Sequence, residues 1–167
     1  MLFDFSQSQN ALAWRSIDDR VMGGVSRSNF TAKDDDGAFA VFSGFLSLDN
    51  NGGFCSVRAD LNQAIPASAE HIWIECRNNM SLGSKDYYLN LRTSDTFDGI
   101  SYRTAFRPIG TFARYECVEF EFTPVFRGRS VIDAPALELT KVRQVGLMVA
   151  DAQVGPFELE IRAIGVF

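Results

Sequence analysis

Apolar and polar side chains alternate along much of this chain with a period of two residues. In the segment 117–122, Val118, Phe120 and Phe122 share one face of an extended strand, and two glutamates lie on the other. Such alternation is typical of strands that bury one face, as in antiparallel sheets. The segment 157–163 repeats it. Its inward face consists of Phe157, Leu159, Ile161 and Ala163. The residues predicted to be buried between two sheets are Phe120, Phe122, Phe157, Leu159 and Ile161.

Six further segments are predicted to be strands: 39–48, 54–59, 72–77, 87–93, 100–106 and 142–149. Turn residues separate them at spacings of roughly 10 to 15 residues, which favours a sandwich or barrel over alternating strands and helices. Helix signals are weak, with a turn or two expected at 59–64 and at 135–139. The run 34–37 is expected to be a solvated hairpin tip. The fold class is therefore predicted to be all-β, an antiparallel β-sandwich.

Two Gly-Gly pairs, Gly23-Gly24 and Gly52-Gly53, stand just before apolar, strand-like runs. Paired glycines mark backbone that takes a positive φ or lies against another chain segment. The residues around both pairs are polar, with Asp18 and Asp19 before the first and Asn50 and Asn51 before the second. A plain surface loop does not need this combination, so both turns are predicted to be specific structural or binding elements.

The residues around these turns resemble the complex I intermediate-associated protein 30 family. The resemblance rests on Trp14, the acidic pair, the run Val-Met-Gly-Gly-Val-Ser at 21–26 and the spaced pattern Phe-x-Gly-x-x-Ser-Leu-x-Asn-Asn-Gly-Gly-Phe-x-Ser-x-Arg at 42–58. It continues through 126–129, 145–148 and 155–161. The resemblance implies a galactose-binding-like jelly roll, formed as one domain by residues 1–167, and a role in assembling NADH:ubiquinone oxidoreductase, complex I.

The chain also departs from the mitochondrial members of that family. Those members follow a transit peptide and carry a Gly-Asp-Gly-Arg-Arg-Tyr motif. Here the segment that ends at Tyr87 lacks the paired arginines. The start of the chain has neither a basic, apolar signal sequence nor an arginine-rich transit sequence. The protein is therefore expected to be a bacterial-type, single-domain member in the cytoplasm, without membrane insertion.

The charge of the chain argues against one class of partner, and its cysteine content predicts the state of the thiols. A formal net charge of −5, with no cluster of basic residues, argues against binding to nucleic acid. Three cysteines without a C-x-x-C spacing are expected to be reduced, and their apolar surroundings predict that they are small buried side chains.

Catalysis has little support in the sequence. His71 is the only histidine, and it begins a predicted strand. The run Gly24-Val25-Ser26-Arg27-Ser28 lacks the final glycine of a nucleophile elbow. Dinucleotide, phosphate-loop and zinc-protease motifs are missing as well. We therefore expect a binding protein with no catalytic residues, no cofactor and no metal.

The first candidate site joins Asp18, Asp19 and Arg58, with Asn50 and Asn51 nearby. An Asp before a Gly-Gly turn can accept backbone N–H groups and fix the turn. Alternation places Arg58 on the same face as Phe54, partly buried, where a guanidinium needs a carboxylate partner. An ion pair between Arg58 and Asp18 or Asp19 is therefore predicted, with contact to a ligand as the alternative.

The second candidate site is a polar and aromatic patch that consists of Trp73, Tyr88, Arg92 and Arg103. If their strands are neighbours, these side chains form the mixture found at protein interfaces, and sugar sites use a similar one. The alternative is an ordinary solvent face with Trp73 tucked under a loop. The predicted function is an assembly factor or chaperone-like scaffold that holds a protein partner. A carbohydrate-binding module is the alternative.

Overall fold

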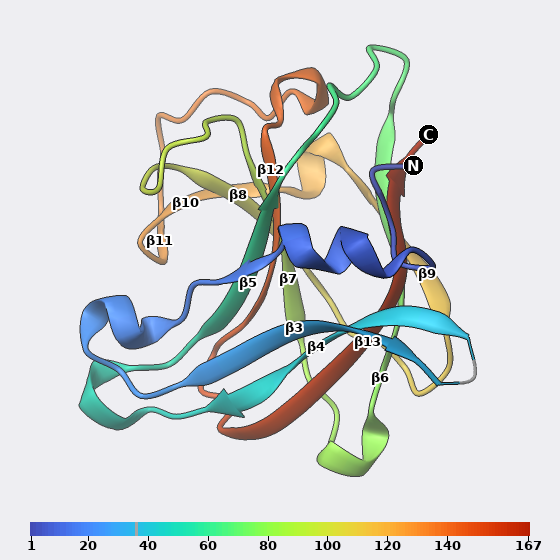
Figure 1. Cartoon of the computed structure of the whole chain (residues 1–167). Coiled ribbons are helices and arrows are strands. Elements are labelled where there is room, and N and C mark those ends of the chain that lie inside the picture. The colour runs from blue at the N-terminus through green and yellow to red at the C-terminus, as the bar shows by residue number, and fades with distance from the viewer. Residues whose placement is uncertain (36) are drawn as a thin grey trace.

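Two antiparallel sheets lie face to face in the computed structural model, which describes residues 1–35 and 37–167 (Figure 1). The first sheet has six strands in the order β3-β4-β13-β6-β9, with β1 paired to β13. The second sheet has seven, in the order β11-β10-β8-β7-β12-β5-β2. Every strand pair in the described residues is antiparallel, which confirms the predicted sandwich.

The strands of the first sheet are β1 (Phe3–Asp4), β3 (Arg27–Asp34), β4 (Ala38–Leu46), β6 (His71–Asn78), β9 (Ala113–Val118) and β13 (Gly155–Val166). Those of the second sheet are β2 (Arg15–Ser16), β5 (Cys55–Asp60), β7 (Tyr87–Arg92), β8 (Ser101–Phe106), β10 (Thr123–Phe126), β11 (Arg129–Ser130) and β12 (Gln144–Val149). The helical segments in the described residues are short 3-10 turns: η1 (Ser8–Ala13), η2 (Asp19–Met22), η3 (Asp49–Asn51), η4 (Met80–Leu82), η5 (Glu119–Glu121) and η6 (Leu139–Lys141). None of them is long and apolar enough to cross a membrane.

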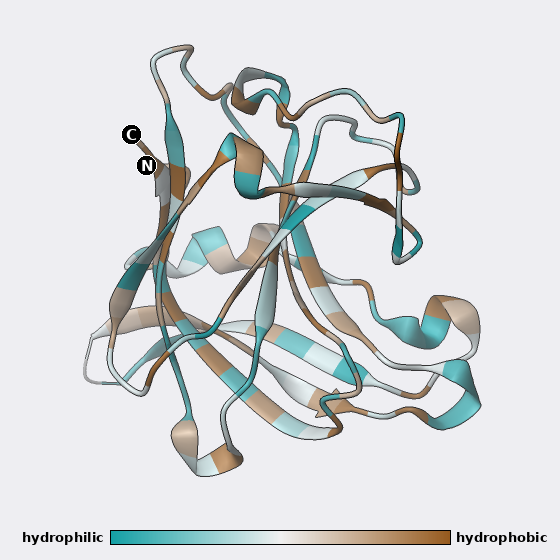
Figure 2. Ribbon diagram, turned by 180° about the vertical axis from the view of Figure 1, so that it is seen from behind, coloured by the Kyte–Doolittle hydropathy of each residue, from teal (hydrophilic) through white to brown (hydrophobic). Residues whose placement is uncertain are grey.

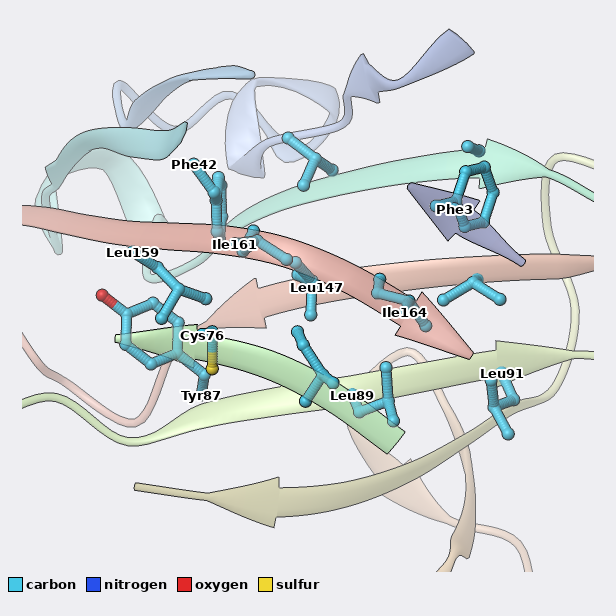
Figure 3. Packing of buried hydrophobic residues seen from close by; sticks show 14 of the residues in the cluster. Phe3, Phe42, Cys76, Tyr87, Leu89, Leu91, Leu147, Leu159, Ile161 and Ile164 are labelled. Carbon is cyan, nitrogen blue, oxygen red and sulfur yellow. The ribbon is translucent and has the colours of Figure 1, made fainter. Parts of the chain in front are cut away.

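Alternate residues of the central strands form the core between the sheets. Leu159 and Ile161 of β13 face Leu89 of β7 and Leu147 of β12 across the interior (Figure 3). Figure 2 shows the corresponding alternation of hydrophobic and hydrophilic residues along the strands. Full burial of one such aliphatic side chain stabilises the fold by about 1.5–3 kcal/mol. The inward face predicted for segment 157–163 is therefore confirmed for Phe157, Leu159 and Ile161. It is wrong for Ala163, because a register shift after Ile161 places Ala163 opposite Glu75 and turns Ile164 into the core instead.

The segment 117–122 differs from the prediction. β9 ends at Val118, and the chain turns through η5 instead of continuing as a strand. The Val118 N–H donates to the Glu121 carboxylate at 2.8 Å, and the Leu139 N–H donates to that of Glu119 at 2.7 Å. These bonds fix a helical turn that shifts the side-chain phase, so Phe120 is 89% exposed. The prediction that Phe120 is buried is wrong, whereas Phe122 is buried.

The β3–β4 hairpin agrees with the expected tip, since Asp34 pairs with Ala38. Asp36, within the expected run 34–37, lies outside the described residues. The expected turn at 59–64 is absent, because β5 continues to Asp60. The one expected at 135–139 appears slightly later, as η6.

Candidate functional site: a carboxylate clasp and an arginine face

Asp18 joins three segments that are distant in the sequence. Its carboxylate accepts hydrogen bonds from the Ser28 N–H at 2.9 Å, the Ser28 hydroxyl at 2.7 Å and the Ser56 N–H at 3.0 Å. Ser28 belongs to β3 of the first sheet and Ser56 to β5 of the second. A charge-assisted bond of this kind is about twice as strong as a neutral one. Asp18 therefore ties the two sheets together at one edge of the sandwich.

Asp19 joins the two Gly-Gly turns and is fully buried. Its carboxylate accepts the Ser26 N–H at 3.0 Å and the Gly53 N–H at 2.7 Å. A Cβ at Gly24 would lie 2.4 Å from the Asp19 Cγ, and one at Gly52 would lie 2.5 Å from the Asp19 Oδ2. Both turns thus need glycine because they pack directly on this carboxylate. We call Asp18, Asp19 and the loops 19–26 and 47–54 the clasp.

Arg58 does not pair with Asp18 or Asp19, so that prediction is wrong. In the described residues Arg58 has no salt bridge at all, although it is only 8% exposed. The reason is competition, because backbone amides and a hydroxyl already occupy both carboxylates of the clasp. The other interpretation of the acidic pair, that it accepts backbone N–H groups and fixes the turn, is confirmed.

The Arg58 side chain instead lies beneath the loop that connects β7 and β8. Its Nη1 and Nη2 donate to the Phe97 carbonyl at 3.4 and 3.3 Å, and the Phe97 ring centroid is 5.6 Å from the Arg58 Cζ. The Arg58 Nε is buried without a hydrogen-bond partner in the described structure. Arg92 holds the same loop, donating to the Phe97 carbonyl at 3.0 Å and to the Gly99 carbonyl at 2.9 Å.

Burial lowers the pKa of Arg58 from 12.5 to about 10, and the nearby positive charges of Arg92 and Arg15 add to this effect. Burial also lowers the pKa of Arg92. The Arg58 guanidinium stays protonated at neutral pH, but burial makes its charged form less favourable than it would be in water. Asp60 and Asp98 lie near enough to oppose this shift in part, but neither forms a salt bridge with Arg58, which thus carries a buried positive charge without a direct carboxylate partner.

Arg58 belongs to a row of residues that crosses the outer face of the second sheet. Strand register places Arg15 of β2, Arg58 of β5, Gly146 of β12, Asn90 of β7 and Arg103 of β8 side by side. Gly146 leaves bare backbone between Arg58 and Asn90, since a Cβ there would lie 2.9 Å from the Val57 carbonyl oxygen. We call this row, with Tyr88 and Arg92 beside it, the arginine face.

Three of the four residues of the second candidate site lie together on the arginine face. The Arg103 Cζ is 4.3 Å from the centroid of the Tyr88 ring, and the Tyr88 hydroxyl donates to Asp151 at 2.6 Å. That hydrogen bond raises the pKa of Tyr88, and partial burial adds to the shift. Tyr88, Arg92 and Arg103 are each partly exposed.

Trp73 is not part of this group, which corrects the expectation of one contiguous patch. β6, which carries Trp73, lies in the first sheet between β13 and β9. The indole is only 6% exposed, because it lies across Gly165 and is covered by Arg114, whose Cζ is 4.0 Å from the ring. The alternative of an indole beneath a loop is also not what the structure shows, since a strand side chain covers it.

Asn50 and Asn51 form the exposed turn of the second clasp loop. Both have left-handed backbone angles, with φ of 55° and 61°. Asn adopts this region more readily than most residues. They lie at the clasp rather than on the arginine face, and η2 and η3 project close together from the same side of the molecule (Figure 1, blue and teal coils).

An open cleft of about 600 Å³ lies beside the clasp, and Phe97, which also contacts Arg58, forms part of its lining. It is lined by Arg20 and Val21 of η2, Arg27 of β3 and the Phe97 ring, among others. None of these was predicted from the sequence to be a site residue. Two signals could have revealed the region: a lone aromatic in the polar segment 94–99, and a glycine inside the apolar strand 144–149, which suggests close approach of another group.

The described residues contain no group of three or more His, Cys, Asp or Glu side chains that could hold a metal ion. His71 stacks on Phe167, with ring centroids 4.8 Å apart, and lies on the first sheet, away from the arginine face. The clasp and the arginine face present rigid backbone, guanidinium groups and exposed aromatic rings. This is the chemistry of binding.

Comparison with known proteins shows the family of this chain and supports its fold. The Complex I intermediate-associated protein 30 family matches residues 3–161. The chain belongs to this family. A family relative, an uncharacterized protein of Schizosaccharomyces pombe, is 33% identical over 181 residues, which cover 98% of this chain and 83% of the relative.

Solved structures with a similar fold include carbohydrate-binding modules and parts of two agarases. The family 11 module from Clostridium thermocellum, in complex with a β-1,3-1,4-mixed-linked tetrasaccharide, has a TM-score of 0.72 and 14% identity, covering 93% of this chain and 89% of the module. The family 11 module of a cellulosomal cellulase of Clostridium thermocellum has a TM-score of 0.74 and 13% identity, covering 100% of this chain and 93% of the module. This Complex I intermediate-associated protein 30 family member is therefore a jelly-roll β-sandwich.

Proposed function

We propose that this protein is a non-catalytic assembly factor that binds a protein partner during the formation of respiratory complex I. Family membership suggests the process, and the clasp supplies the observation that supports protein binding. Above the fully buried Asp19, the tip of the clasp exposes Val21, Met22, Val25 and Leu48, which are 62%, 63%, 44% and 47% exposed.

Large apolar side chains clustered on a surface favour binding to another protein. The two loops are already held in place, because Ser26 and Ser47 exchange two hydrogen bonds of 2.9 and 3.0 Å across them, in addition to those of Asp19. A preformed loop loses little conformational entropy on binding. The clasp is therefore suited to hold a partner and to release it without a chemical step.

Affinity purification from the native host tests this proposal. The tagged protein is expected to co-purify with complex I subunits, and the double variant V21S/M22S should lose most of them, because the exposed apolar contact is removed. Leu12→Ser is the matched control, since Leu12 is 85% exposed but belongs to η1. Subunits that co-purify equally with all three proteins would show that the clasp is not the contact, and no enrichment at all would refute the role in complex I.

Carbohydrate binding is the second candidate, and Tyr88 is the observation that favours it. The ring lies beside Asn90 and Arg103 on an open sheet face, the combination that binds sugar rings and hydroxyl groups. Arg103 nevertheless covers one face of the ring at 4.3 Å, where a sugar would stack. A glycan array with wild-type protein and Tyr88→Ala decides the question. Specific glycan binding that disappears in the variant would replace the assembly proposal. The cytoplasmic location of the protein also stays a prediction.

A further inference from the structure

The arginine face concentrates positive charge on a protein that is acidic overall. The whole chain carries a formal net charge of −5. On this face, Arg58, Arg92 and Arg103 have no carboxylate within salt-bridge distance in the described residues, and neither have Arg20 and Arg27 of the adjoining cleft.

The acidic residues nearby are already engaged. Arg15 pairs with Asp60 at 3.5 Å, and Arg127 pairs with Asp98 at 2.7 Å. Asp151 accepts the Tyr88 hydroxyl, and Asp18 is occupied by the clasp. No carboxylate of the described residues therefore forms a salt bridge with Arg58, Arg92 or Arg103.

Arg58 is the charged side chain on this face whose hydrogen-bonding groups are least satisfied by the described residues. A guanidinium has five N–H donors in a flat fork that matches a carboxylate. Here two donors reach one carbonyl at 3.3 and 3.4 Å, and the buried Nε has no partner in the described structure. Burying a charge without an opposite charge is costly, and such a cost is usually found where function requires it.

A second unsatisfied group lies close by on the same face. The Gln144 side chain is only 1% exposed and donates to Asp60 at 2.6 Å, but its Oε1 has no partner in the described residues. Strand register places Gln144 between Asp60 and Arg92, one row from Arg58. Gln144 and Arg58 are thus two buried polar side chains, one row apart, whose hydrogen-bonding groups the described residues do not fully satisfy.

We infer that the arginine face binds an acidic segment of the partner protein, with one carboxylate against Arg58 and a backbone N–H near Gln144. The free arginines extend from Arg103 across the sheet to Arg20 and Arg27 in the cleft, which favours an extended chain with several carboxylates over a single small anion. This inference rests on the proposed function, because it specifies the chemistry of the same partner.

The test measures binding of a fluorescein-labelled hexaglutamate peptide by fluorescence anisotropy at low salt. Wild type should bind the peptide, and added salt should weaken the binding, because exposed charge pairs are screened. Arg58→Met keeps the length of the side chain but removes its charge, and it should weaken binding about tenfold or more (~1.4 kcal/mol per tenfold). Arg129→Met is the matched control. Its position in β11 pairs with Phe126, so alternation places it on the opposite side of the sheet, and its binding should stay within about twofold of wild type.

Separate arms replace the peptide by hexalysine, inorganic phosphate, glucuronate or an oligothymidylate. Equal binding by wild type and Arg58→Met, or no binding of hexaglutamate, would overturn the inference. So would tighter binding of glucuronate, phosphate or the oligothymidylate than of hexaglutamate. Arg58→Met should remain folded, with a melting temperature no lower than that of wild type, because a buried unpaired charge is removed. If it does not fold, Arg58→Lys keeps the charge without the planar fork and should still bind hexaglutamate more weakly.

The peptide assay tests the acidic segment, and the purification of complex I subunits tests the role in assembly, so either proposal can be refuted without the other. Loss of peptide binding with retained co-purification would refute only the acidic segment. Peptide binding that depends on Arg58, without any co-purified subunit, would instead refute the role in complex I.

Discussion

At the residue scale, Asp19 explains why both Gly-Gly turns occur in this sequence. In each pair one glycine has a positive φ, 85° for Gly23 and 151° for Gly53. The other glycine, Gly24 or Gly52, is needed for a different reason, because its missing side chain leaves room for the Asp19 carboxylate. The motif that identifies the family is thus a structural clasp around one buried charge. Any partner contact at this place comes from the exposed residues above it.

Gly24→Ala and Gly128→Ala separate steric clash from backbone strain. A Cβ at Gly24 would lie 2.4 Å from the Asp19 Cγ, so the clasp must shift, at a cost of about 2–3 kcal/mol in the free energy of unfolding. Gly128 has a φ of 77°, but no atom lies within 4 Å of the place that a Cβ would take, so only strain of about 1 kcal/mol is expected. Urea denaturation followed by circular dichroism measures both, and equal losses would contradict packing of Gly24 on Asp19.

At the element scale, β9 and η5 show how a polar side chain can override a strand pattern. The alternation through residues 117–122 is real, but two glutamates accept backbone N–H groups and turn the chain after Val118. β13 keeps its alternation from Phe157 to Ile161, because it pairs there with β4 on one side and with β6 on the other; beyond Ile161 a register shift against β6 changes the phase. A strand flanked on both sides has its backbone groups satisfied by neighbours, so side-chain acceptors cannot compete.

The variants Phe120→Ala and Phe122→Ala test this change of phase. The same truncation is made two residues apart, at positions that are 89% and 7% exposed. Removal of a buried Phe side chain costs about 3–5 kcal/mol, whereas an exposed substitution usually stays within about 0.5 kcal/mol. Thermal and chemical denaturation should therefore show a large loss for Phe122→Ala only. Similar losses for both would mean that the segment is a continuous strand.

At the scale of the whole molecule, the sandwich encloses the three cysteines in one interior. Cys55 belongs to the second sheet, and Cys76 and Cys117 belong to the first. Burial, followed by the charges of Asp18 and Asp19, raises the pKa of the Cys55 thiol from 9.0 to about 12. Burial raises the pKa of Cys117 to about 11, with Glu121 adding to it, and raises the pKa of Cys76 as well. The thiols therefore stay protonated and protected while the sandwich is closed.

Thiol reactivity should consequently report opening of the whole molecule. At pH 8 the native protein is expected to react with Ellman's reagent far more slowly than the urea-unfolded protein, in which all three thiols react. Because the folded pKa values are raised, only the unfolded state ionises between about pH 9 and 11, so the free energy of unfolding should fall as the pH rises through this range. Rapid reaction of a single thiol in native protein would indicate local opening at that strand.

The sequence by itself determined the eight segments that form or contribute to the long central strands, and the inward residues at the start of β13. Side chains of a strand alternate between its two faces, so Leu159 and Ile161 could be placed inside without knowing their neighbours. The same local rule put Ser56 and Arg58 on one face and predicted that Arg58 is partly buried. Turn residues gave the strand boundaries to within a few positions, and family motifs implied the jelly roll. Single-domain organisation over residues 1–167 stays a prediction.

Only the tertiary structure decided which faces meet and which groups pair. Trp73 and Tyr88 come from consecutive strands, but β6 joined the first sheet and β7 the second. Asp18 and Asp19 were within reach of backbone amides from β3, β5 and both glycine turns, and these donors left no carboxylate for Arg58. Alternation is a property of one strand, whereas sheet order and hydrogen-bond partners depend on contacts between segments far apart in the chain. A buried arginine without a counter-charge is therefore visible only in the folded protein.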